Sequence, residues 1–388
     1  MYALQNFSHY LDHSIREFRC FLCFKSFQRY RKLRAHFAAA PVFSVPEQSN
    51  SAVVLFDFFS KRIDGPQGRR FYALYTFFQR AGFQPFVVDR YSFLSNLHHK
   101  HKAFVQQQAL QVLRGQAPAQ PFVLVSDAPK RSSYFNAAQK AVRVSFDSDF
   151  NEASTDFPMP FPMFSGVYRS AQDLQLKHLR QTRRQWSVFF GGGAQEGKYS
   201  KAAIEKIYSV MPRAKALAVL KSAFGPQWRQ TSEQQTLGEH LNSDWPGIQV
   251  IENSQCKIGA DQWLASLAKA RFFLALPGVR YPMSHNLIES LALGVVPILQ
   301  YNRLLFPALE HGKNCLVYSD DTSLKQVVAD AMAMPETRWR QMSAAAIDYY
   351  QSYLAPEAAI RSLLQHPADG KLITMRLLPF LKRGGGYA

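Results

Sequence analysis

From residue 52 onward, short apolar runs alternate along the chain with amphipathic patterns of helical period. The run "AVVLFDFF" predicts a strand, "RRFYALYTFFQRAGF" predicts a helix closed by Gly82, and "QPFVVDR" predicts a second strand. The later runs "FVLVSDAP" and "KAVRVSFDSDF" are rich in β-branched residues and end in turns that contain Asp. Strands that alternate with helices in this way indicate βα units on a parallel sheet.

The same alternation starts again after a proline-rich stretch. In "FPMPFPMFSGVY", at 157–168, the alternating prolines exclude both a helix and a central strand, so we expect a linker there. Beyond it, "WSVFFGGG", "KALAVL", "GIQVIE", "RFFLALPG" and "VVPIL" predict strands, with "SHNLIESLALG" among the predicted helices. Helical patterns dominate from 323 to 366. The sequence therefore predicts an α/β protein with two doubly wound, Rossmann-like domains.

The length of 388 residues agrees with two domains rather than one core. We expect a basic, aromatic helical arm over residues 1–49, an N-terminal Rossmann-like domain over 50–160 and a C-terminal one over 161–345. Residues 346–388 are predicted to form a C-terminal helical segment, and crossing back to the N-terminal domain is one option for it.

The charge and the cysteine content indicate which classes of partner and which cellular compartment to expect. The formal net charge of +18 favours polyanions, which include nucleic acid, an anionic membrane leaflet and phosphorylated substrates. The four cysteines are scattered, which favours a reducing compartment. The N-terminus has no signal-peptide pattern, and no apolar run approaches the roughly 18 residues of a membrane span. We expect a cytoplasmic protein that is soluble or peripheral on the inner face of the membrane.

A glycine-rich turn marks one candidate binding site in the second domain. Gly191, Gly192 and Gly193 follow a predicted strand and precede a helix, where bare backbone can approach a phosphate or a sugar. Lys198 and Lys201 lie just beyond and are placed to balance phosphate charge. A plain tight turn is the alternative interpretation.

A second candidate segment is "ALPGVRYPMSHNLIESLALGVVPIL", from Ala275 to Leu299. Ser284 stands where a helix N-cap belongs, and Glu289 follows five residues later on that helix. The carboxylate could accept hydrogen bonds from ribose or sugar hydroxyls, while Ser284 and the helix N-terminus meet phosphate. Alternatively, Ser284 is only a cap and Glu289 an exposed helix residue. The candidate donor-binding residues of this segment are Pro277, Gly278, Arg280, Tyr281, Ser284, His285, Asn286 and Glu289.

The order of these motifs resembles the donor-binding domain of GT-B glycosyltransferases, most closely those of exostosin type. The resemblance covers about residues 157–330 and includes "DQWLASLAKARFFLALPG" before the Ser and "PALEHGKNCLVYSDD" after it. Exostosin-type sequences usually carry an Arg where this chain has Asn286, so Arg280 or Lys198 would have to supply that charge. The retaining pattern of two glutamates separated by seven residues is absent, because Met283 stands in that place, and this favours an inverting enzyme.

The resemblance implies two domains that face each other across a cleft, with a nucleotide-sugar donor on the second and a glycan or lipid-linked acceptor on the first. It implies no cofactor and no metal ion, since basic side chains and helix N-termini stabilise the departing phosphate. The nearest match to a metal-binding Asp-x-Asp motif is "DSD" at Asp147–Asp149, which we interpret as a turn. The activity implied is glycosyl transfer, plausibly in bacterial surface polysaccharide or lipopolysaccharide synthesis.

An inverting transfer requires a general base near the acceptor hydroxyl. Asp64 in "KRIDGPQGRR" and Asp127 in "VSDAPK" both follow predicted strands of the first domain, and we take these two as catalytic candidates. Each has an alternative role as a turn or cap residue. His285 is a third option, with contact to the donor as its more natural role.

Two further function classes have to be considered, and the arm suggests the first of them. In "FRCFLCFKSFQRYRKLRAHF", Cys20, Cys23 and His36 have the spacing of three zinc-finger ligands, but positions 40–42 are Ala, Pro and Val, so the fourth ligand is missing. A zinc-dependent nucleic-acid-binding protein is therefore only the second-ranked hypothesis, and we expect no nucleic acid among the partners. A basic amphipathic helix over residues 16–36 would instead contact an anionic membrane or pack on the enzyme, and both remain open. A non-catalytic glycan- or nucleotide-binding module on a GT-B scaffold is the third class.

Overall fold

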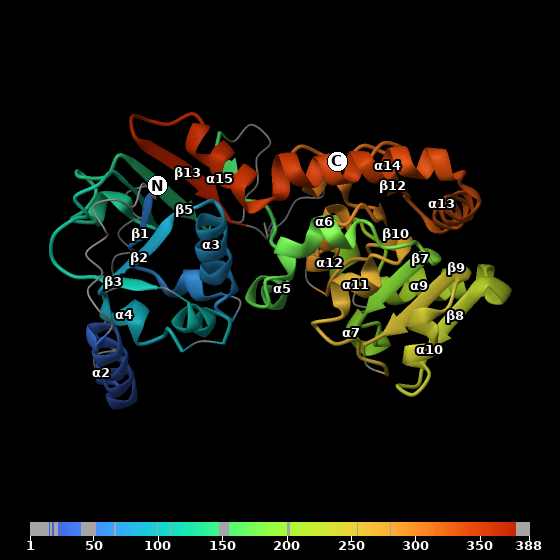
Figure 1. The fold of residues 1–388 in the computed structure, drawn as a ribbon, viewed down its shortest axis with the longest axis horizontal. Coiled ribbons are helices and arrows are strands. Elements are labelled where there is room, and N and C mark those ends of the chain that lie inside the picture. Colours follow the sequence, from blue (N-terminus) through green and yellow to red (C-terminus); the bar gives the residue numbers. More distant parts are fainter. Residues whose placement is uncertain are drawn as a thin grey trace. The chain divides into compact units, whose positions relative to one another are not determined.

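The computed structural model describes two compact units, each with its own sheet (Figure 1). The first unit comprises Met1–Asp147, Asn151–Met159 and Pro356–Leu377, and the second consists mainly of Pro160–Ala355. The description covers Ile15, Phe18, residues 22–39 and residues 52–377, the latter without Pro66, His99, Ala109, 147–154, Ser200, Lys201, Ser254 and Arg280.

The first unit is built on a parallel sheet in the order β3-β2-β1-β4-β5-β13-β6. Its strands are β1 Val53–Phe56, β2 Gln84–Val88, β3 Gln111–Leu113, β4 Phe122–Ser126, β5 Lys140–Ser145, β6 Phe157–Pro158 and β13 Leu372–Arg376. Its helices are α2 Phe24–Ala39, α3 Arg69–Arg80, α4 Tyr91–Leu94 and α15 Pro356–Gln365, with 3-10 turns η1 Lys61–Asp64, η2 Lys102–Gln107 and η3 Pro129–Arg131. Strands β1 and β4 are buried along their whole length, as expected when both faces of a parallel sheet are covered.

The second unit is built on a six-stranded parallel sheet in the order β12-β11-β10-β7-β9-β8. Its strands are β7 Trp186–Gly192, β8 Trp228–Thr231, β9 Trp245–Glu252, β10 Ala270–Leu274, β11 Val296–Leu299 and β12 Leu316–Val317. Its helices are α5 Ser165–Arg169, α6 Leu176–Leu179, α7 Glu196–Tyr199, α8 Ala202–Tyr208, α9 Arg213–Ala223, α10 Leu237–Asn242, α11 Trp263–Leu267, α12 His285–Ala292, α13 Asp321–Ala333 and α14 Glu336–Tyr349. Shorter turns are η4 Gln172–Gln175, η5 Gly225–Gln227, η6 Asn302–Leu304 and the π-helical η7 Tyr350–Leu354.

The two parallel sheets confirm the predicted fold class, but two predicted elements are wrong. The run "KALAVL" lies within α9 and is not a strand. Its Ala and Leu residues have high helix propensity, and Ala216, Leu217 and Leu220 bury one face of the helix. The C-terminal segment is not helical throughout, because β13 follows α15 and pairs with β5 and β6.

Each sheet has a point at which the strand order reverses. In the first unit the chain builds β2 and β3 on one side of β1 and then places β4 on the other side. In the second unit β8 and β9 lie on one side of β7, and β10 lies on the other. Ligands of open α/β sheets bind at the carboxyl ends of the strands that flank such a switch point, here β1 with β4 and β7 with β10.

Candidate functional site

The three glycines lie at the carboxyl end of β7, at the switch point of the second unit, but the prediction that all three follow the strand is wrong: Gly191 and Gly192 are the last residues of β7 and pair with β9, and only Gly193 lies beyond it. Asn286 Nδ2 donates a hydrogen bond to the Gly191 carbonyl at 3.0 Å, which brings the start of α12 to this strand end. A Cβ atom added to Gly191 would lie 2.7 Å from the rings of both Phe189 and Trp263. Only glycine fits that position, so this strand end is held closely between α12 and α11.

Arg213, the first residue of α9, joins the ends of β7 and β10. Its Nη1 donates to the Gly193 carbonyl at 2.6 Å and its Nη2 to the Leu276 carbonyl at 3.1 Å, while its guanidinium lies 4.4 Å from the centroid of the Tyr199 ring. The residue is only 9% exposed, and its Nε has no hydrogen-bond partner. Burial lowers the pKa of Arg213, but an arginine still remains protonated in proteins.

The charge of Arg213 is not balanced within the described part of the chain. No carboxylate there forms an ion pair with it, and the contacts that stabilise it are two backbone carbonyl groups and the rings of Tyr199 and Phe190. A buried cation without a counter-ion is costly. A bound anion at this switch point would remove that cost. Sequence reasoning missed this residue because "KALAVL" was assigned to a strand, so the start of a helix was not sought at Arg213.

The loop between β10 and α12 is tightly folded. The Gly278 N–H donates to the Pro282 carbonyl at 3.2 Å, and a Cβ atom on Gly278 would lie 2.5 Å from the Tyr281 carbonyl oxygen. The Tyr281 ring is buried and packs edge-on against Tyr208, with centroids 5.7 Å apart. Pro277 therefore begins a tightly folded loop that leads to the start of α12. Arg280 lies outside the described residues.

The first residues of α12 bind the proline-rich stretch itself. Ser284 occupies the N-cap with extended backbone, and its side chain makes no capping hydrogen bond. His285 Nδ1 lies 2.7 Å from the Pro162 carbonyl, and its ring packs 5.0 Å from the Phe161 ring. Ser284, His285 and Asn286 are all half-buried. Lys198 is exposed, with its ammonium 5.5 Å from the Tyr199 ring, so it lies next to the aromatic partner of Arg213.

Glu289 is completely buried in the second unit, so the alternative of an exposed helix residue is wrong. Its Oε1 accepts a hydrogen bond from the Phe164 N–H at 2.8 Å, and its Oε2 accepts one from Trp263 Nε1 at 2.5 Å. Burial raises the pKa of Glu289 to about 7, against the lowering effect of these two donors. Contact between this carboxylate and ribose hydroxyls remains a prediction, and because the side chain is completely buried it would require a rearrangement that exposes the carboxylate.

In the first unit, Asp127 lies just beyond β4 at the switch point. Its two carboxylate oxygens accept hydrogen bonds from the backbone N–H groups of Phe59 and Ser60, at 2.8 and 2.7 Å. These N–H groups belong to the loop after β1, so the carboxylate joins the two strands that flank the switch point. Burial raises the pKa of Asp127 to about 6, and the charge of nearby Asp57 acts in the same direction.

A pair of residues that sequence reasoning missed lies beside Asp127. Asp57 is completely buried at the end of β1 and forms a two-pronged ion pair with Arg90, of which the Nη2–Oδ2 bond measures 2.8 Å. The Arg90 guanidinium also lies 3.8 Å from the centroid of the Phe59 ring. Phe59 is the residue whose backbone N–H donates to Asp127. This arrangement fixes the loop that holds the Asp127 carboxylate.

Asp64, the other catalytic candidate, has a different environment. Its carboxylate accepts a hydrogen bond from Lys102 Nζ at 2.6 Å, and the Lys102 side chain is fully buried. Lys102 Nζ also donates to the Phe93 carbonyl at 3.2 Å. The Asp64 carboxylate therefore compensates a buried charge, a task that it could not keep if it accepted a proton from a substrate.

Among the described residues, no group of three or more His, Cys, Asp or Glu side chains is placed to hold a metal ion. Asp147–Asp149 and Cys20 lie outside the described residues, while Cys23 is an exposed free thiol. None of the helices that the structure describes has the length and apolar composition needed to span a bilayer.

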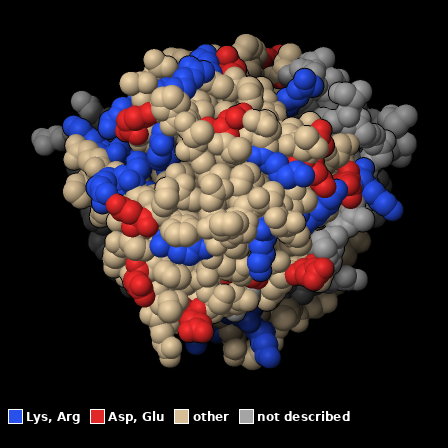
Figure 2. Space-filling model, turned by 90° about the vertical axis from the view of Figure 1, so that its right-hand side faces the viewer, with Lys and Arg blue, Asp and Glu red and all other residues tan. Residues whose placement is uncertain are grey.

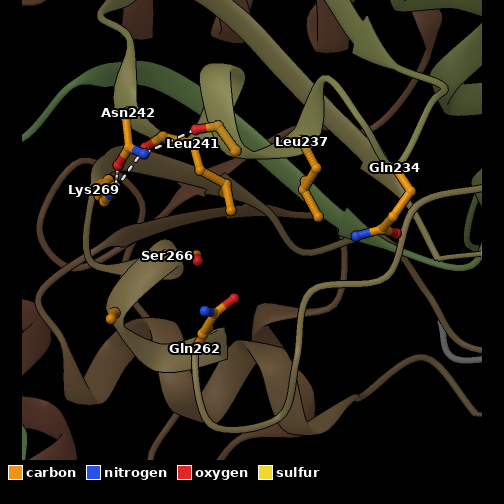
Figure 3. Close-up of a pocket in the computed structure, with 9 residues that line it drawn as sticks. Gln234, Leu237, Leu241, Asn242, Gln262, Ser266 and Lys269 are labelled. Carbon is orange, nitrogen blue, oxygen red and sulfur yellow. Dashed lines mark hydrogen bonds between the residues drawn. The ribbon is translucent and has the colours of Figure 1, made fainter.

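A groove of about 410 Å³ lies between α10 and α11, away from the predicted donor residues (Figure 3). Leu237 and Leu241 extend into it from α10, and Gln262 and Ser266 face them from α11. Lys269 is the charged residue of its lining, and its ammonium donates to the Leu241 carbonyl at 2.5 Å. With that cation already engaged, the groove offers little to a diphosphate.

Comparisons with known proteins give no family: no protein-family model and no curated protein matches the chain. Among solved structures, Anabaena Alr3699/HepE in complex with UDP is similar with a TM-score of 0.40 and 9% identity, over 81% of this chain and 98% of that chain. T4 phage BGT in complex with UDP-glucose has a TM-score of 0.36 and 10% identity, over 81% and 99% of the two chains. The UDP-forming α,α-trehalose-phosphate synthase of Burkholderia vietnamiensis has 0.33 and 12%, over 77% and 78%. Because these TM-scores and sequence identities are low, the function has to be inferred from the residues of this chain.

Proposed function

We propose that the chain is a glycosyltransferase that moves a sugar from a nucleotide-sugar donor to a glycan or glycolipid acceptor. The observation that carries the proposal is the buried guanidinium of Arg213, which joins the ends of β7 and β10 at the switch point and has no carboxylate partner among the described residues. Doubly wound sheets bind nucleotides at this place, and the phosphates of a nucleotide would supply the missing negative charge. The motif order over 157–330, which resembles GT-B transferases, supports the same conclusion.

On the donor side, Arg213 would face the diphosphate together with the half-buried N-terminal residues of α12 and the backbone of Gly192 and Gly193. Asn286, at the position where exostosin-type sequences carry Arg, would act through the Gly191 carbonyl that it binds. In this scheme the charge that develops on the leaving diphosphate is met by a fixed cation and by helix N–H groups, so no metal ion and no cofactor are required.

On the acceptor side, Asp127 would be the general base of an inverting transfer. The acceptor hydroxyl oxygen attacks C1 of the donor sugar, its proton passes to the Asp127 carboxylate, and the bond between C1 and the phosphate oxygen breaks. The electron pair of that bond leaves with the nucleoside diphosphate. A carboxyl with a pKa of about 6 is mostly ionised at neutral pH and is more basic than an ordinary Asp, as this role requires.

The acceptor that we propose is a glycan or lipid-linked glycan of a bacterial surface polysaccharide or lipopolysaccharide. The enzyme would act in the cytoplasm, peripheral on the inner face of the membrane. A thermal-shift screen with nucleoside diphosphates and nucleotide sugars tests donor binding directly, because a ligand that binds only the folded state raises its melting temperature by mass action.

For the variant Arg213→Met, we expect about 10- to 100-fold weaker binding of the nucleotide found in that screen, since one charge-assisted contact is lost. Methionine keeps the apolar stem of the side chain and removes only the guanidinium. The measurement is isothermal titration of the variant and the wild type with the same nucleoside diphosphate.

The matched control is Lys215→Met on the same helix, because Lys215 is half exposed and pairs with Asp321 at 3.2 Å on the surface. We expect this variant to bind like the wild type. Equal weakening in both variants would mean that general charge, not the Arg213 site, holds the nucleotide. Absence of binding to the wild type by every nucleotide tested would overturn the proposed function.

A further inference from the structure

We propose that α2 and the residues just before it form a docking surface for an anionic lipid bilayer. The proposal concerns the exposed apolar and basic side chains of the arm, and it does not depend on glycosyl transfer. The sequence left two options for the arm, contact with a membrane or packing on the enzyme. In the structure, some residues of the arm pack on the first unit while others are exposed.

One face of α2 packs on the first unit. Ser26, Tyr30, Leu33 and Phe37, which are spaced by four, three and four residues, are half-buried along this face. The Tyr30 hydroxyl donates to Asp89 Oδ1 at 3.1 Å, and the Tyr30 ring packs 5.0 Å from the Tyr91 ring. Helix α2 thereby lies beside α4, to which Tyr91 belongs (Figure 1).

Two arginines add to this attachment. Arg34 Nε lies 3.5 Å from Asp89 Oδ2, and Arg114 Nη2 donates to the Arg34 carbonyl at 3.1 Å. Arg114 Nε also donates to Asp89 Oδ2 at 2.8 Å, so Asp89 binds the helix and the body of the unit together. The helix is therefore attached through polar contacts and is not buried by them.

Other positions of the arm expose large apolar side chains. Phe24 is 70% exposed and Phe27 is 38% exposed, and the preceding residues Leu22, Phe18 and Ile15 are 66%, 63% and 44% exposed. Eight large apolar side chains are exposed in the described part of the chain, and five of them are these arm residues. Such a concentration of exposed apolar surface indicates a contact with another molecule.

Basic side chains lie among these apolar ones. Lys25, Arg31 and Lys32 are exposed on α2, and no acidic residue occurs between 22 and 39. The face in Figure 2, by contrast, shows Lys and Arg interspersed with Asp and Glu. The arm therefore combines one sign of charge with exposed apolar surface, which is the composition of helices that lie in the interface of anionic membranes.

The aliphatic members of the surface favour lipid over nucleic acid as the occupant. Aromatic side chains stack on bases, but Ile15 and Leu22 have no π-face and would gain little from a single strand. Both enter the boundary between headgroups and acyl chains, next to Phe18 and Phe24. The partner chemistry that fits all five apolar residues and the cations is a bilayer with anionic headgroups.

The test is co-sedimentation of the full chain with vesicles, either of phosphatidylcholine alone or of phosphatidylcholine with phosphatidylglycerol. We expect binding to the anionic vesicles only, and a loss of that binding in high salt, where screening shortens electrostatic interactions to a few ångströms. For Lys25→Gln/Lys32→Gln, the partition coefficient should fall about fivefold for each charge removed. For Phe24→Ser/Phe27→Ser, we expect a loss of at least tenfold, because two exposed rings no longer enter the bilayer.

Leu174→Ser is the control, because Leu174 is 65% exposed but belongs to the second unit and not to the arm. We expect it to bind vesicles like the wild type. Equal binding to both kinds of vesicle, or full binding by Phe24→Ser/Phe27→Ser, would overturn the proposal, as would preference for single-stranded nucleic acid over anionic vesicles in direct competition. A wild type that binds vesicles but no nucleotide would support the docking surface while contradicting the proposed function.

Discussion

Replacement of Asp127 by Asn should reduce glycosyl transfer by a factor of about 10² to 10⁴, the usual contribution of a positioned general base, without weakening donor binding. The amide cannot accept the proton of the acceptor hydroxyl, while the proposed donor site lies in the other unit. Release of nucleoside diphosphate from the donor identified by thermal shift, with lipid-linked glycans extracted from bacteria as acceptors, measures the rate. Titration with the same donor measures its affinity.

The pH dependence of the wild type adds a second test of the base. Burial raises the pKa of Asp127 to about 6, and only its ionised form can take a proton. The rate at low acceptor concentration should therefore rise about tenfold per pH unit below 6 and become constant above it. Asp244→Asn, on an exposed carboxylate that pairs with Arg183, is the matched control and should keep both the rate and its pH profile. If Asp127→Asn keeps them too, Asp127 is not the base.

The sequence predicted the two sheets because their strands are short, apolar and separated by helical patterns. It failed for two elements, each for a local reason. In α9 the Ala and Leu residues satisfy both a strand and a helix pattern, and the helix begins at Arg213 directly after Pro212, a start that the apolar run does not mark. In β13 the five residues from Leu372 to Arg376 become a strand because β5, more than 200 residues earlier, provides the pairing edge.

The candidate site shows the same division between local and distant causes. The end of β7 and the start of α12 were predicted from local pattern, and the structure places Gly191 of β7 in contact with Asn286 of α12. Arg213 was missed because its role depends on carbonyl groups 20 and 63 residues away. The environment of Glu289 was missed because its donors, Phe164 and Trp263, are 125 and 26 residues distant in the chain. Pattern identifies where a strand ends, whereas packing decides which charges are buried there.

The burial of Glu289 has a consequence for stability against pH. The pKa of this carboxyl is about 7 in the folded second unit and 4.5 in its ordinary state, so between these values the folded chain holds a proton that the unfolded chain has lost. Stability therefore falls as pH rises from 4.5 to 7 and is constant above that range. The size of the fall attributable to Glu289 is on the order of 3 kcal/mol.

Glu289→Gln should remove this pH dependence, because the amide does not titrate. Relative to the wild type, the variant should therefore gain stability between pH 5 and pH 8. Glu289→Ala should instead lose about 3 to 5 kcal/mol at pH 5, since the Phe164 N–H and Trp263 Nε1 are left without an acceptor beside a cavity. Urea unfolding followed by tryptophan fluorescence measures both effects, and it reports the second unit alone, because all five tryptophans of the chain lie within Pro160–Ala355.

Glu336→Gln is the matched control for these measurements, because that carboxylate is half exposed and pairs with Arg340 on α14. Its stability relative to the wild type should be nearly the same at pH 5 and pH 8. If Glu289→Gln behaves in the same way, the Glu289 carboxyl does not titrate in a buried environment. If instead Glu289→Gln gains stability with pH and also keeps donor affinity, Glu289 acts by holding Trp263 against Gly191, and direct contact with ribose hydroxyls is wrong.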